Sequence, residues 1–542
     1  MNRNEEKRFG SARFATEGEI EAAGLFNPNG LQIGFFGERP LYYNGDAPMA
    51  LFGGSGSGKH RDILGHVLSQ PQHAAGMVLD LKGELAATSI IAYAPLGLHV
   101  LTWNPSGIAG LPKVRLNPID MLNCNSASVH ADCRMLAESL IPFSGGGESR
   151  YFENRAREWV GAWLLFLTEQ HGRVTLVQLS DLLNMIEGDT EEWIKVLDVM
   201  MESKHANIRR AAGEILAKQS ESQREFGAIL GTIYGCLSIL DDPMLRASLE
   251  NPQYDFSDFV SEGNAYIFLT VPAEYVSMWS PILRCFFTAV MIHKARQQGS
   301  GRITFIIDEA AQLGRFEGLK NLYTYGRGLG IRTWGVFQDI GQITANYGPS
   351  GVQTFIGSSA CRQFLGTRDY QTAHMISDML GSETLTYIDP LLQTRARHAK
   401  VDAVMRILNG DPITAAWDYK RFQFEATHRP KQARKLMTPD EILTMGEDRQ
   451  LILLAGMNLP PIFAHKRPYY TSQSLAGRYL PNPYHPPSDS VIVETAHGAE
   501  RRRIITEPVP PELAHLVQYS GGWWAYVDGY RPSLGRKFRN GI

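Results

Sequence analysis

Residues 51–60 read "LFGGSGSGKH", and this stretch decides the fold. From Gly53 to Lys59 it has the spacing GxxxxGK of a P-loop, whose backbone N–H groups cradle phosphate. The apolar run 47–52 before it predicts a buried strand, and residues 60–68 after it predict a helix. Both the loop and the helix N-terminus then face phosphate. The residues expected to contact a nucleotide are Gly53, Gly54, Ser55, Gly56, Ser57, Gly58, Lys59 and His60.

His60 departs from the usual pattern, which has Ser or Thr after the lysine. That hydroxyl is a hard oxygen ligand for Mg²⁺, and imidazole is a poor substitute. We therefore expect His60 to be an exposed helix residue with no metal role. A weaker hold on the metal and slow hydrolysis would follow.

Further short apolar runs predict the remaining strands of a sheet. They lie at 77–80, 265–271, 303–308, 332–338, 361–366 and 450–456. Helical patterns separate most of them, as expected for parallel strands joined by crossover helices. The sequence therefore predicts an α/β fold.

One of these runs, "ITFIIDEAAQLG" at 303–314, ends in two carboxylates. Asp308 would hold Mg²⁺, and Glu309 would orient and deprotonate the attacking water. Taken alone, a pair of acids at a strand end in a loop explains this pattern equally well. Lys59 upstream favours the nucleotide site.

The helical period changes between about 150 and 260, where apolar residues recur every three or four positions and no convincing strand interrupts them. We therefore expect an all-helical domain inserted into the sheet domain. The predicted division is a lead-in segment 1–46, a nucleotide-binding domain 47–169 and 256–470, an all-alpha domain 170–255, and a Pro-rich linker and C-terminal tail 471–542.

Composition excludes several classes of protein. The chain has 542 residues, and its 53 Lys and Arg nearly balance its 56 Asp and Glu, so net charge gives no argument for nucleic acid. Its five cysteines are scattered without a CxxC pair, which argues against a disulfide or zinc framework. No signal peptide and no apolar run of membrane-spanning length is apparent in the sequence.

Taken together, the motifs resemble those of the TraG/TraD-like coupling ATPases of type IV secretion. The resemblance covers about residues 9–470. It rests on "FGSARFATEGEIEAAGL" (9–25), the P-loop, "VLDLKGEL" (78–85), "LNPID" (116–120), "ITFIIDEAAQLG" (303–314), "GRGLGIRTWGVFQDIGQITANYG" (326–348), "DYQTAHMISDMLG" (369–381) and "MTPDEILTMGEDRQLILLAGM" (437–457).

The resemblance implies a RecA-like motor domain with an all-alpha domain, using ATP and Mg²⁺. It also implies a homo-hexameric ring at the base of a secretion channel. Such proteins recruit relaxase-bound single-stranded DNA or effector proteins and drive their transfer. In that family the position after the P-loop lysine is often not Ser or Thr, so His60 does not by itself indicate an inactive enzyme.

Carried over by motif, Lys59 corresponds to the P-loop lysine, and Asp308 and Glu309 to the Walker B pair. Gln338 matches the polar residue that ends the next strand and senses the outer phosphate. Arg327 matches the arginine that relatives present to a neighbouring subunit's nucleotide. Without the family, we would interpret Arg327 as a surface salt-bridge residue and Gln338 as a satisfied strand-end amide.

Most relatives begin with transmembrane helices, whereas this chain starts at the segment that normally follows them. We therefore expect a cytoplasmic protein recruited to the cytoplasmic face of the inner membrane by other secretion components. A competing interpretation is a catalytically weak docking platform that binds secretion substrates without motor activity. His60 favours the platform, and the five matched positions favour the motor.

Overall fold

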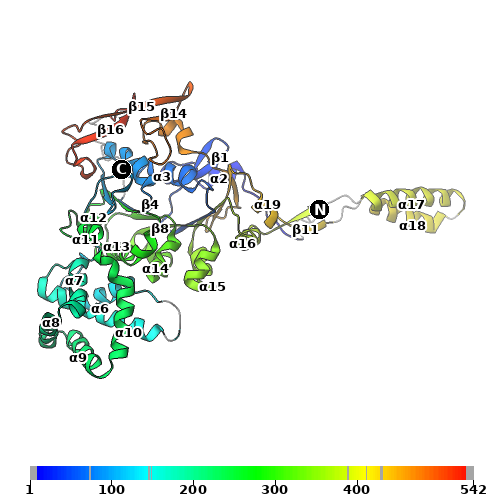
Figure 1. Cartoon of the computed structure of the whole chain (residues 1–542). Coiled ribbons are helices and arrows are strands. Elements are labelled where there is room, and N and C mark those ends of the chain that lie inside the picture. Colours follow the sequence, from blue (N-terminus) through cyan, green and yellow to red (C-terminus); the bar gives the residue numbers. More distant parts are fainter. Residues whose placement is uncertain are drawn as a thin grey trace.

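The centre of the molecule is an eleven-stranded sheet with the strand order β2-β1-β13-β12-β9-β3-β8-β7-β4-β6-β5 (Figure 1). The structure, a computed structural model, describes residues 9–72, 75–143, 147, 149–386, 390–410, 412–427 and 431–532. The seven strands from β9 to β5 are parallel to one another. They are β3 (Met49–Gly53), β4 (Ala75–Leu81), β5 (His99–Trp103), β6 (Ala265–Val271), β7 (Ile303–Ile307), β8 (Ile331–Phe337) and β9 (Cys361–Leu365).

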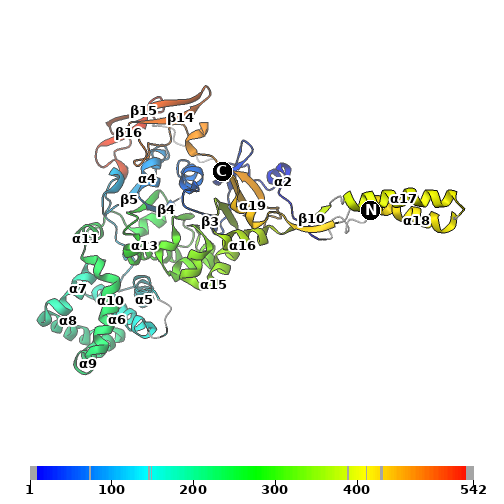
Figure 2. The same cartoon turned by 45° about the vertical axis from the view of Figure 1, so that its right-hand side comes forward.

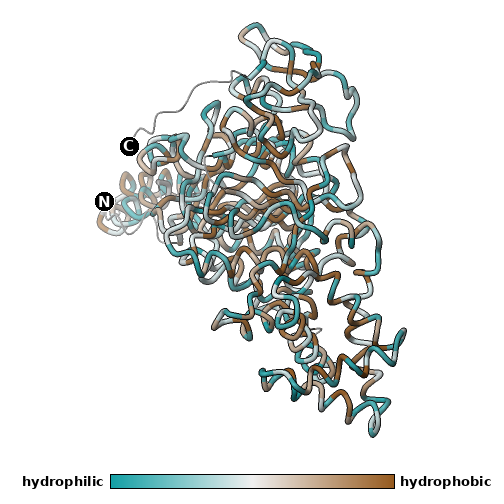
Figure 3. Tube along the Cα trace, turned by 90° about the vertical axis from the view of Figure 1, so that its left-hand side faces the viewer, coloured by the Kyte–Doolittle hydropathy of each residue, from teal (hydrophilic) through white to brown (hydrophobic). Residues whose placement is uncertain are grey.

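These strands are apolar because both faces of the sheet are covered. Phe52 and Leu79 lie in one apolar cluster, whereas their chain neighbours Leu51 and Val78 lie in the other. Successive side chains of a strand point to opposite faces, so each strand supplies both cores. Figure 3 shows hydrophobic stretches of the trace gathered in this central layer. The predicted α/β fold is confirmed.

The other side of the sheet is antiparallel. It consists of β1 (Leu31–Phe36), β2 (Arg39–Tyr43), β12 (Arg449–Leu454) and β13 (Ile462–His465). The run 450–456, which the sequence analysis places among the parallel strands, is thus a strand but runs opposite to β9. An apolar run does not record strand direction, and here the chain between β9 and β12 passes through α16 (Tyr370–Leu380), the ribbon of β10 (Ser382–Thr386) and β11 (Lys431–Lys435), and α19 (Pro439–Leu443) rather than through one crossover helix. The short connection to β13 then makes β12 and β13 a hairpin.

Helices cover both faces of the sheet. Four of them follow β6 to β9, namely α13 (Val276–Arg296), α14 (Glu317–Tyr325), α15 (Ile340–Ser358) and α16 (Tyr370–Leu380). In the described part of the chain, α13 is the one continuous helix long and apolar enough to cross a membrane, and 89% of its most apolar stretch is buried inside the protein. A bent pair, Gln223–Asp241 with Pro243–Leu249, passes the same test jointly. Core helices of soluble proteins pass this test too.

A helical domain lies below the sheet in the views of Figures 1 and 3. It is built from α6 (Ser149–His171), α7 (Leu176–Gly188), α8 (Thr190–Glu202), α9 (Ala206–Glu221), α10 (Gln223–Leu237) and α11 (Pro243–Leu249), between α5 (Val129–Leu140) and α12 (Phe256–Glu262) of the sheet domain. Trp159 and Trp163 of α6 pack on Phe226 and Trp193, with ring centroids 5.7 and 6.3 Å apart. The predicted boundary at residue 170 lies at the end of α6 and assigns its indoles to the nucleotide-binding domain, although they pack on α8 and α10.

The C-terminal region forms a small three-stranded antiparallel sheet, β14 (Ser490–Thr495), β15 (Gly498–Pro508) and β16 (Trp523–Val527), where the sequence analysis expects a linker and tail. Gln518 docks it onto the edge strand β5. The side-chain oxygen of Gln518 accepts from Val100 N at 2.9 Å, and its Nε2 donates to Leu98 O at 3.0 Å. The Gln518 amide thus makes the two hydrogen bonds that a neighbouring strand would make to β5. The C-terminal region is therefore a folded module attached to the main sheet rather than a tail.

A helical hairpin, α17 (Pro390–Leu408) and α18 (Pro412–Thr427), stands away from the body on a two-stranded ribbon, β10 (Ser382–Thr386) and β11 (Lys431–Lys435) (Figures 1 and 2). The ribbon also touches the start of the described chain, where Phe9 N donates to Thr384 Oγ1 at 3.0 Å. The sequence analysis contains no expectation for this hairpin.

Candidate functional site

The carboxyl ends of four parallel strands bring the predicted residues together. The P-loop follows β3, Lys82 and Glu84 follow β4, Asp308 and Glu309 follow β7, and Gln338 follows β8. Most of these side chains border one cavity of about 780 Å³, which also reaches the segment 469–492. Ligands of open α/β sheets bind at this end of the strands.

The P-loop turn depends on glycine at specific positions. Gly56 and Gly58 have φ of 73° and 85°, the left-handed region that favours glycine. A Cβ on Gly58 would collide with the Asp62 carboxylate. After the loop, Lys59–Leu64 form one π-helical turn, η1, that continues into α3 (Gly65–Leu68). Such π turns are frequent at functional sites.

Lys59, Glu309 and Gln338 form one hydrogen-bonded chain. Lys59 Nζ donates to Glu309 Oε1 at 2.7 Å and to Gly53 O at 3.1 Å. Gln338 Nε2 donates to the other carboxylate oxygen of Glu309 at 3.1 Å. Glu309 itself has a φ of 49°, a conformation that is uncommon for a residue with a side chain. Two residues that follow different strands, Lys59 and Gln338, therefore converge on the carboxylate of Glu309.

Two further carboxyl groups lie at neighbouring strand ends with raised pKa values. Burial, and then the adjacent Glu309 carboxylate, raise the pKa of Asp308 to about 6. Burial raises the pKa of Asp80 to about 7, although its Oδ2 accepts from Ala86 N at 2.8 Å. Its Oδ1 has no hydrogen-bond partner among the described residues. Both groups would gain from a nearby cation.

His60 is not the exposed helix residue that the sequence analysis expects. Its ring lies in the cavity wall, where Nδ1 is 3.1 Å from Glu84 Oε2 and the ring stacks on Tyr469 at a centroid distance of 6.1 Å. Nε2 is buried and has no partner among the residues that the structure describes. The reason is the first turn of η1, which directs residue 60 toward the end of β4 and its Glu84.

The donor set suits Mg²⁺ bound together with phosphate. Within the described residues, no three His, Cys, Asp or Glu side chains lie close enough to hold a metal ion by themselves. Mg²⁺ usually takes one or two carboxylates plus phosphate oxygens and water rather than a full protein cage. Asp308, partly buried beside Lys59, fits that requirement.

The sequence analysis did not identify Lys466, whose buried ammonium group contacts the P-loop backbone. Its Nζ donates to Ser57 O at 2.6 Å and to Asp62 Oδ2 at 2.7 Å, and both charged side chains are almost completely buried, at 2% and 1% exposed. A lysine in "AHKRP" after a strand carries no signal for this contact. Only the fold brings residue 466 next to residue 57.

Arg368 lies beside the P-loop, whereas Arg327 lies at the opposite edge of the sheet. The side chain of Arg368, which follows β9, lies along Gly54 and Gly56 of the P-loop and was not predicted. Arg327 is exposed and precedes β8, so it lies at the amino ends of the parallel strands, opposite to Lys59. The structure therefore does not bring Arg327 together with the other predicted site residues of its own chain.

The C-terminal region completes the cavity wall. Tyr469, Tyr470 and the segment 479–492 line the side opposite the P-loop. Tyr484 donates its hydroxyl to Lys82 O at 2.8 Å, which ties this segment to the end of β4. The segment that the sequence analysis describes as a linker therefore forms part of the site.

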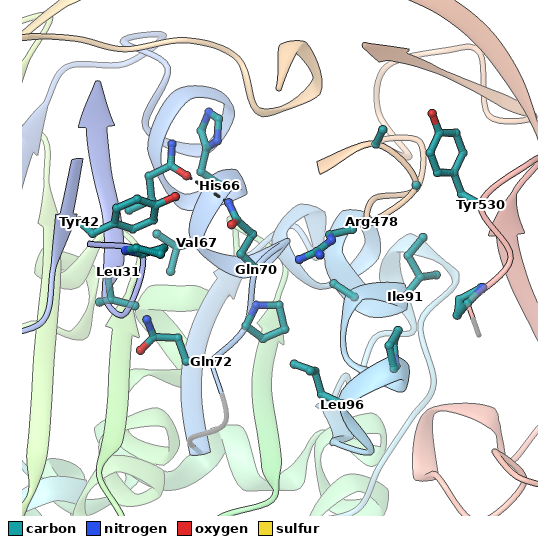
Figure 4. Close-up of a pocket in the computed structure, with 18 of the residues that line it drawn as sticks. Leu31, Tyr42, His66, Val67, Gln70, Gln72, Ile91, Leu96, Arg478 and Tyr530 are labelled. Atoms are coloured by element: carbon teal, nitrogen blue, oxygen red, sulfur yellow. Dashed lines mark hydrogen bonds between the residues drawn. The ribbon is translucent and has the colours of Figure 1, made fainter. Parts of the chain in front are cut away.

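A second cavity, of about 550 Å³, lies on the same side of the sheet between β1, β2, α3 and the C-terminal module (Figure 4). Leu31, Tyr42 and Leu96 line it together with Gln70, which donates to Gln32 at 3.1 Å. Arg478 extends toward the glutamines from the opposite wall. Among the described residues that line this cavity there is no carboxylate. It offers no counterpart to the Lys59, Asp308 and Glu309 constellation.

Comparison with known proteins places the site in context. The family model described as type IV secretory system conjugative DNA transfer matches residues 13–389 and 420–490, well over half of the chain. Protein VirD4 of Rhizobium radiobacter is 22% identical over 483 residues, which cover 87% of this chain and 65% of VirD4. Conjugal transfer protein TraG of Escherichia coli is 22% identical over 477 residues, covering 80% of this chain and 71% of TraG. The chain thus spans about two thirds of these relatives.

Solved structures share the fold. The bacterial conjugative coupling protein TrwBdeltaN70 superposes with a TM-score of 0.59 at 14% identity, covering 85% of this chain and 95% of that one. The plasmid coupling protein TrwB in complex with the ATP analogue ADPNP gives 0.54 at 13% identity, covering 84% and 93%. TrwB in complex with ADP and Mg²⁺ gives 0.52 at 14% identity, with the same coverage.

Proposed function

The chain belongs to the type IV secretory system conjugative DNA transfer family, and from this membership we propose that it is an ATP-driven coupling protein. It recruits relaxase-bound single-stranded DNA or effector proteins to a secretion channel and powers their transfer by hydrolysing ATP with Mg²⁺. The observation that carries the proposal is the chain Lys59–Glu309–Gln338 in front of a P-loop. TrwB, which shares the fold, has been solved with ADPNP and with ADP and Mg²⁺.

Each residue has one task in this proposal. Lys59 and the P-loop N–H groups neutralise and hold the outer phosphates. Asp308 holds the metal, which supplies positive charge to the phosphate oxygens when bound. Glu309 orients the attacking water and takes its proton. Gln338, hydrogen-bonded to Glu309, reports the presence of the outer phosphate to β8.

Arg327 acts on a neighbouring copy. Because it lies at the amino ends of the strands and Lys59 at the carboxyl ends, its guanidinium reaches a phosphate only in another subunit's P-loop. An arginine supplied in trans stabilises the charge that develops on the transferred phosphoryl group. We therefore infer a homo-hexameric ring, held at the cytoplasmic face of the inner membrane by other secretion components.

One observation favours the competing proposal of a catalytically weak docking platform. His60 stands where a metal-binding hydroxyl is usual, and its Nδ1 lies at hydrogen-bond distance, 3.1 Å, from Glu84 Oε2. ATP turnover separates the two proposals. The motor predicts hydrolysis that single-stranded DNA stimulates and that Lys59→Ala abolishes. Tight nucleotide binding with no turnover above that of Lys59→Ala would establish the platform.

A further inference from the structure

The hairpin α17–α18 is a feature of this chain rather than of its family pattern. The family match omits residues 390–419, which include all of α17 and the first half of α18. Figures 1 and 2 both show the hairpin projecting from the body, with no other helix or strand of the described chain beside it. Its surface chemistry is therefore not explained by contacts with the sheet or the helical domain.

Small residues hold the two helices together. Ala396 and Ala403 of α17 and Ala415 of α18 are buried, at 5%, 1% and 0% exposed. Polar contacts close one edge of the hairpin, where Arg406 donates to Asp418 at 2.8 Å. Ile407 and Phe422 are half-buried beside these alanines, about 40° and 20° around their helices from Ala403 and Ala415. Other large apolar side chains of the hairpin are exposed and face away from this contact.

On α17, exposed large apolar side chains form a stripe that faces away from α18. Val401, Val404, Met405 and Leu408 follow the spacing i, i+3, i+4, i+7 of one helix face, and all four are exposed, Leu408 at 75%. At 100° per residue the centre of this stripe lies about 150° around the helix from Ala403, which faces α18. We call this face the α17 stripe.

On α18 a second stripe points the other way. Ile413 and Trp417 are 75% and 76% exposed and lie one turn apart. They lie about 160° and 200° around the helix from the buried Ala415. We call this face the α18 stripe. The hairpin therefore carries apolar side chains on two opposite sides, with charged residues such as Lys400 and Asp402 between them.

Opposite stripes restrict what can cover them. A flat surface, such as a bilayer or a single groove, covers one side and leaves the other in water. Burying the whole distal end in lipid would also bury Arg406, Asp418 and Asp402, which is costly. A second copy of this chain can cover the α17 stripe with its own α18 stripe. A third copy can cover the α18 stripe of the first with its α17 stripe.

We propose that the hairpin is a self-association surface, in which the α17 stripe of one subunit packs against the α18 stripe of the next. Such head-to-tail contacts are heterologous, and they generate a ring where the rotation between subunits closes. In such a ring the hairpins form a second layer of contacts between subunits, held away from the sheet domains by the β10–β11 ribbons. It requires neither nucleotide nor hydrolysis, so its test is independent of the motor proposal.

Cross-linking tests the head-to-tail geometry in the full chain without nucleotide. Met405→Cys labels the α17 stripe and Trp417→Cys labels the α18 stripe. With a short bismaleimide, the double variant should give a ladder of multimers, whereas each single variant should match the wild-type chain and its five native cysteines. Self-cross-linking of Met405→Cys alone would indicate a two-fold contact and overturn the proposal.

Charge insertion tests the energetics. Val404→Glu and Trp417→Glu each place a carboxylate in one stripe, and Asn409→Glu, at the exposed tip but outside both stripes, is the matched control. Loss of an interface anchor worth about 2 kcal/mol raises a dissociation constant about 30-fold. Sedimentation should show this weakening for both stripe variants, with thermal unfolding and nucleotide affinity unchanged.

Two results would overturn the proposal. One is unchanged self-association of both stripe variants. The other is binding of the wild-type chain to vesicles containing anionic lipid that Trp417→Glu abolishes, which would make a membrane surface the occupant. In either case Lys59→Ala still reports separately on the P-loop, so failure of the hairpin proposal is distinguishable from failure of the motor proposal.

Discussion

Lys59 Nζ donates to Glu309 Oε1 at 2.7 Å, although 250 residues separate the two in the chain. Both side chains are mostly buried, at 12% and 17% exposed, so solvent screens the pair only weakly. The cation that would bind outer phosphates is thus neutralised by the carboxylate that would activate water. In the proposed mechanism, phosphate at Lys59 would compete with Glu309, and its arrival would release Glu309 toward the water.

Glu309→Gln should separate binding from hydrolysis. The amide removes the competing charge, so the affinity for ATP should stay equal or rise, while turnover should fall about 10²-fold or more because the general base is lost. Equilibrium binding and steady-state hydrolysis measure the two effects. Glu317→Gln, at the start of α14, where the half-buried carboxylate pairs with Arg315, should change neither. Unaltered turnover in Glu309→Gln would remove this residue from the mechanism.

His60→Thr should lower the Mg²⁺ concentration needed for half-maximal activity and raise turnover. It restores a hard oxygen after the P-loop lysine and removes the ring from the cavity wall. Glu84→Gln is the control, because it loosens the His60 ring without providing a hydroxyl. A magnesium titration of all three proteins measures the effect. If His60→Thr needs as much Mg²⁺ as the wild type or more, the imidazole has a role of its own.

Lys466→Met should destabilise the fold and loosen the P-loop. It removes the buried cationic partner of Asp62, which keeps only the half-exposed Arg61, and it frees Ser57 O. Losing a hydrogen bond to a charged group costs about 1.5 to 3 kcal/mol. Lys435→Met breaks the exposed pair with Asp378 and should cost less than about 1 kcal/mol. Denaturant unfolding compares the two. Equal losses would show that Lys466 is no more important than a surface lysine.

Asp80 should make stability fall as pH rises. Its pKa is raised to about 7 in the folded protein, so between about pH 4 and pH 7 the folded state binds more protons than the unfolded state, and the free energy of unfolding decreases. Asp308, at about 6, acts in the same direction. Asp80→Asn should flatten this dependence and be more stable than wild type at about pH 8. The exposed Asp402→Asn should keep the wild-type profile.

Arg327→Ala and Lys59→Ala should complement each other. Each alone should be nearly inactive, since an arginine acting in trans is typically worth about 10³ to 10⁵ in rate. In a mixed ring, the intact P-loop of an Arg327→Ala subunit meets the intact arginine of a Lys59→Ala neighbour, which restores one complete site. Turnover of co-assembled mixtures, compared with each variant alone, is the measurement. Mixtures no more active than their components would contradict a site shared between subunits.

Local sequence carries much of the site. The residues Gly53–Lys59, Asp308 and Glu309 are recognisable because a buried strand ending in a loop leaves a short apolar run followed by polar residues, whereas Gln338 enters only through the family resemblance. Parallel strands then place all their carboxyl ends at one edge, so the convergence of these residues follows from the pattern alone. The same reasoning places Arg327, before β8, at the opposite edge.

Apolar periodicity did not predict the direction of a strand or the element on which a segment packs. An apolar run is equally a parallel or an antiparallel strand, so β12 was predicted to be a strand but with the wrong direction. The Pro-rich C-terminal region lacks a strong pattern, yet its strands pack onto β5 through Gln518. The hairpin α17–α18 has apolar residues both at its helix contact and on its outer faces, so the apolar pattern does not show which side is buried.

The sequence by itself thus determined the α/β fold, the P-loop and the carboxylates at its strand ends, because these depend on neighbours within about ten residues. Only the tertiary structure decided that Lys59 is paired with Glu309, that His60 is held by Glu84, and that Lys466 supports the loop. Those contacts join residues from separate strands and helices. Their distances depend on how whole elements pack, which no local pattern records.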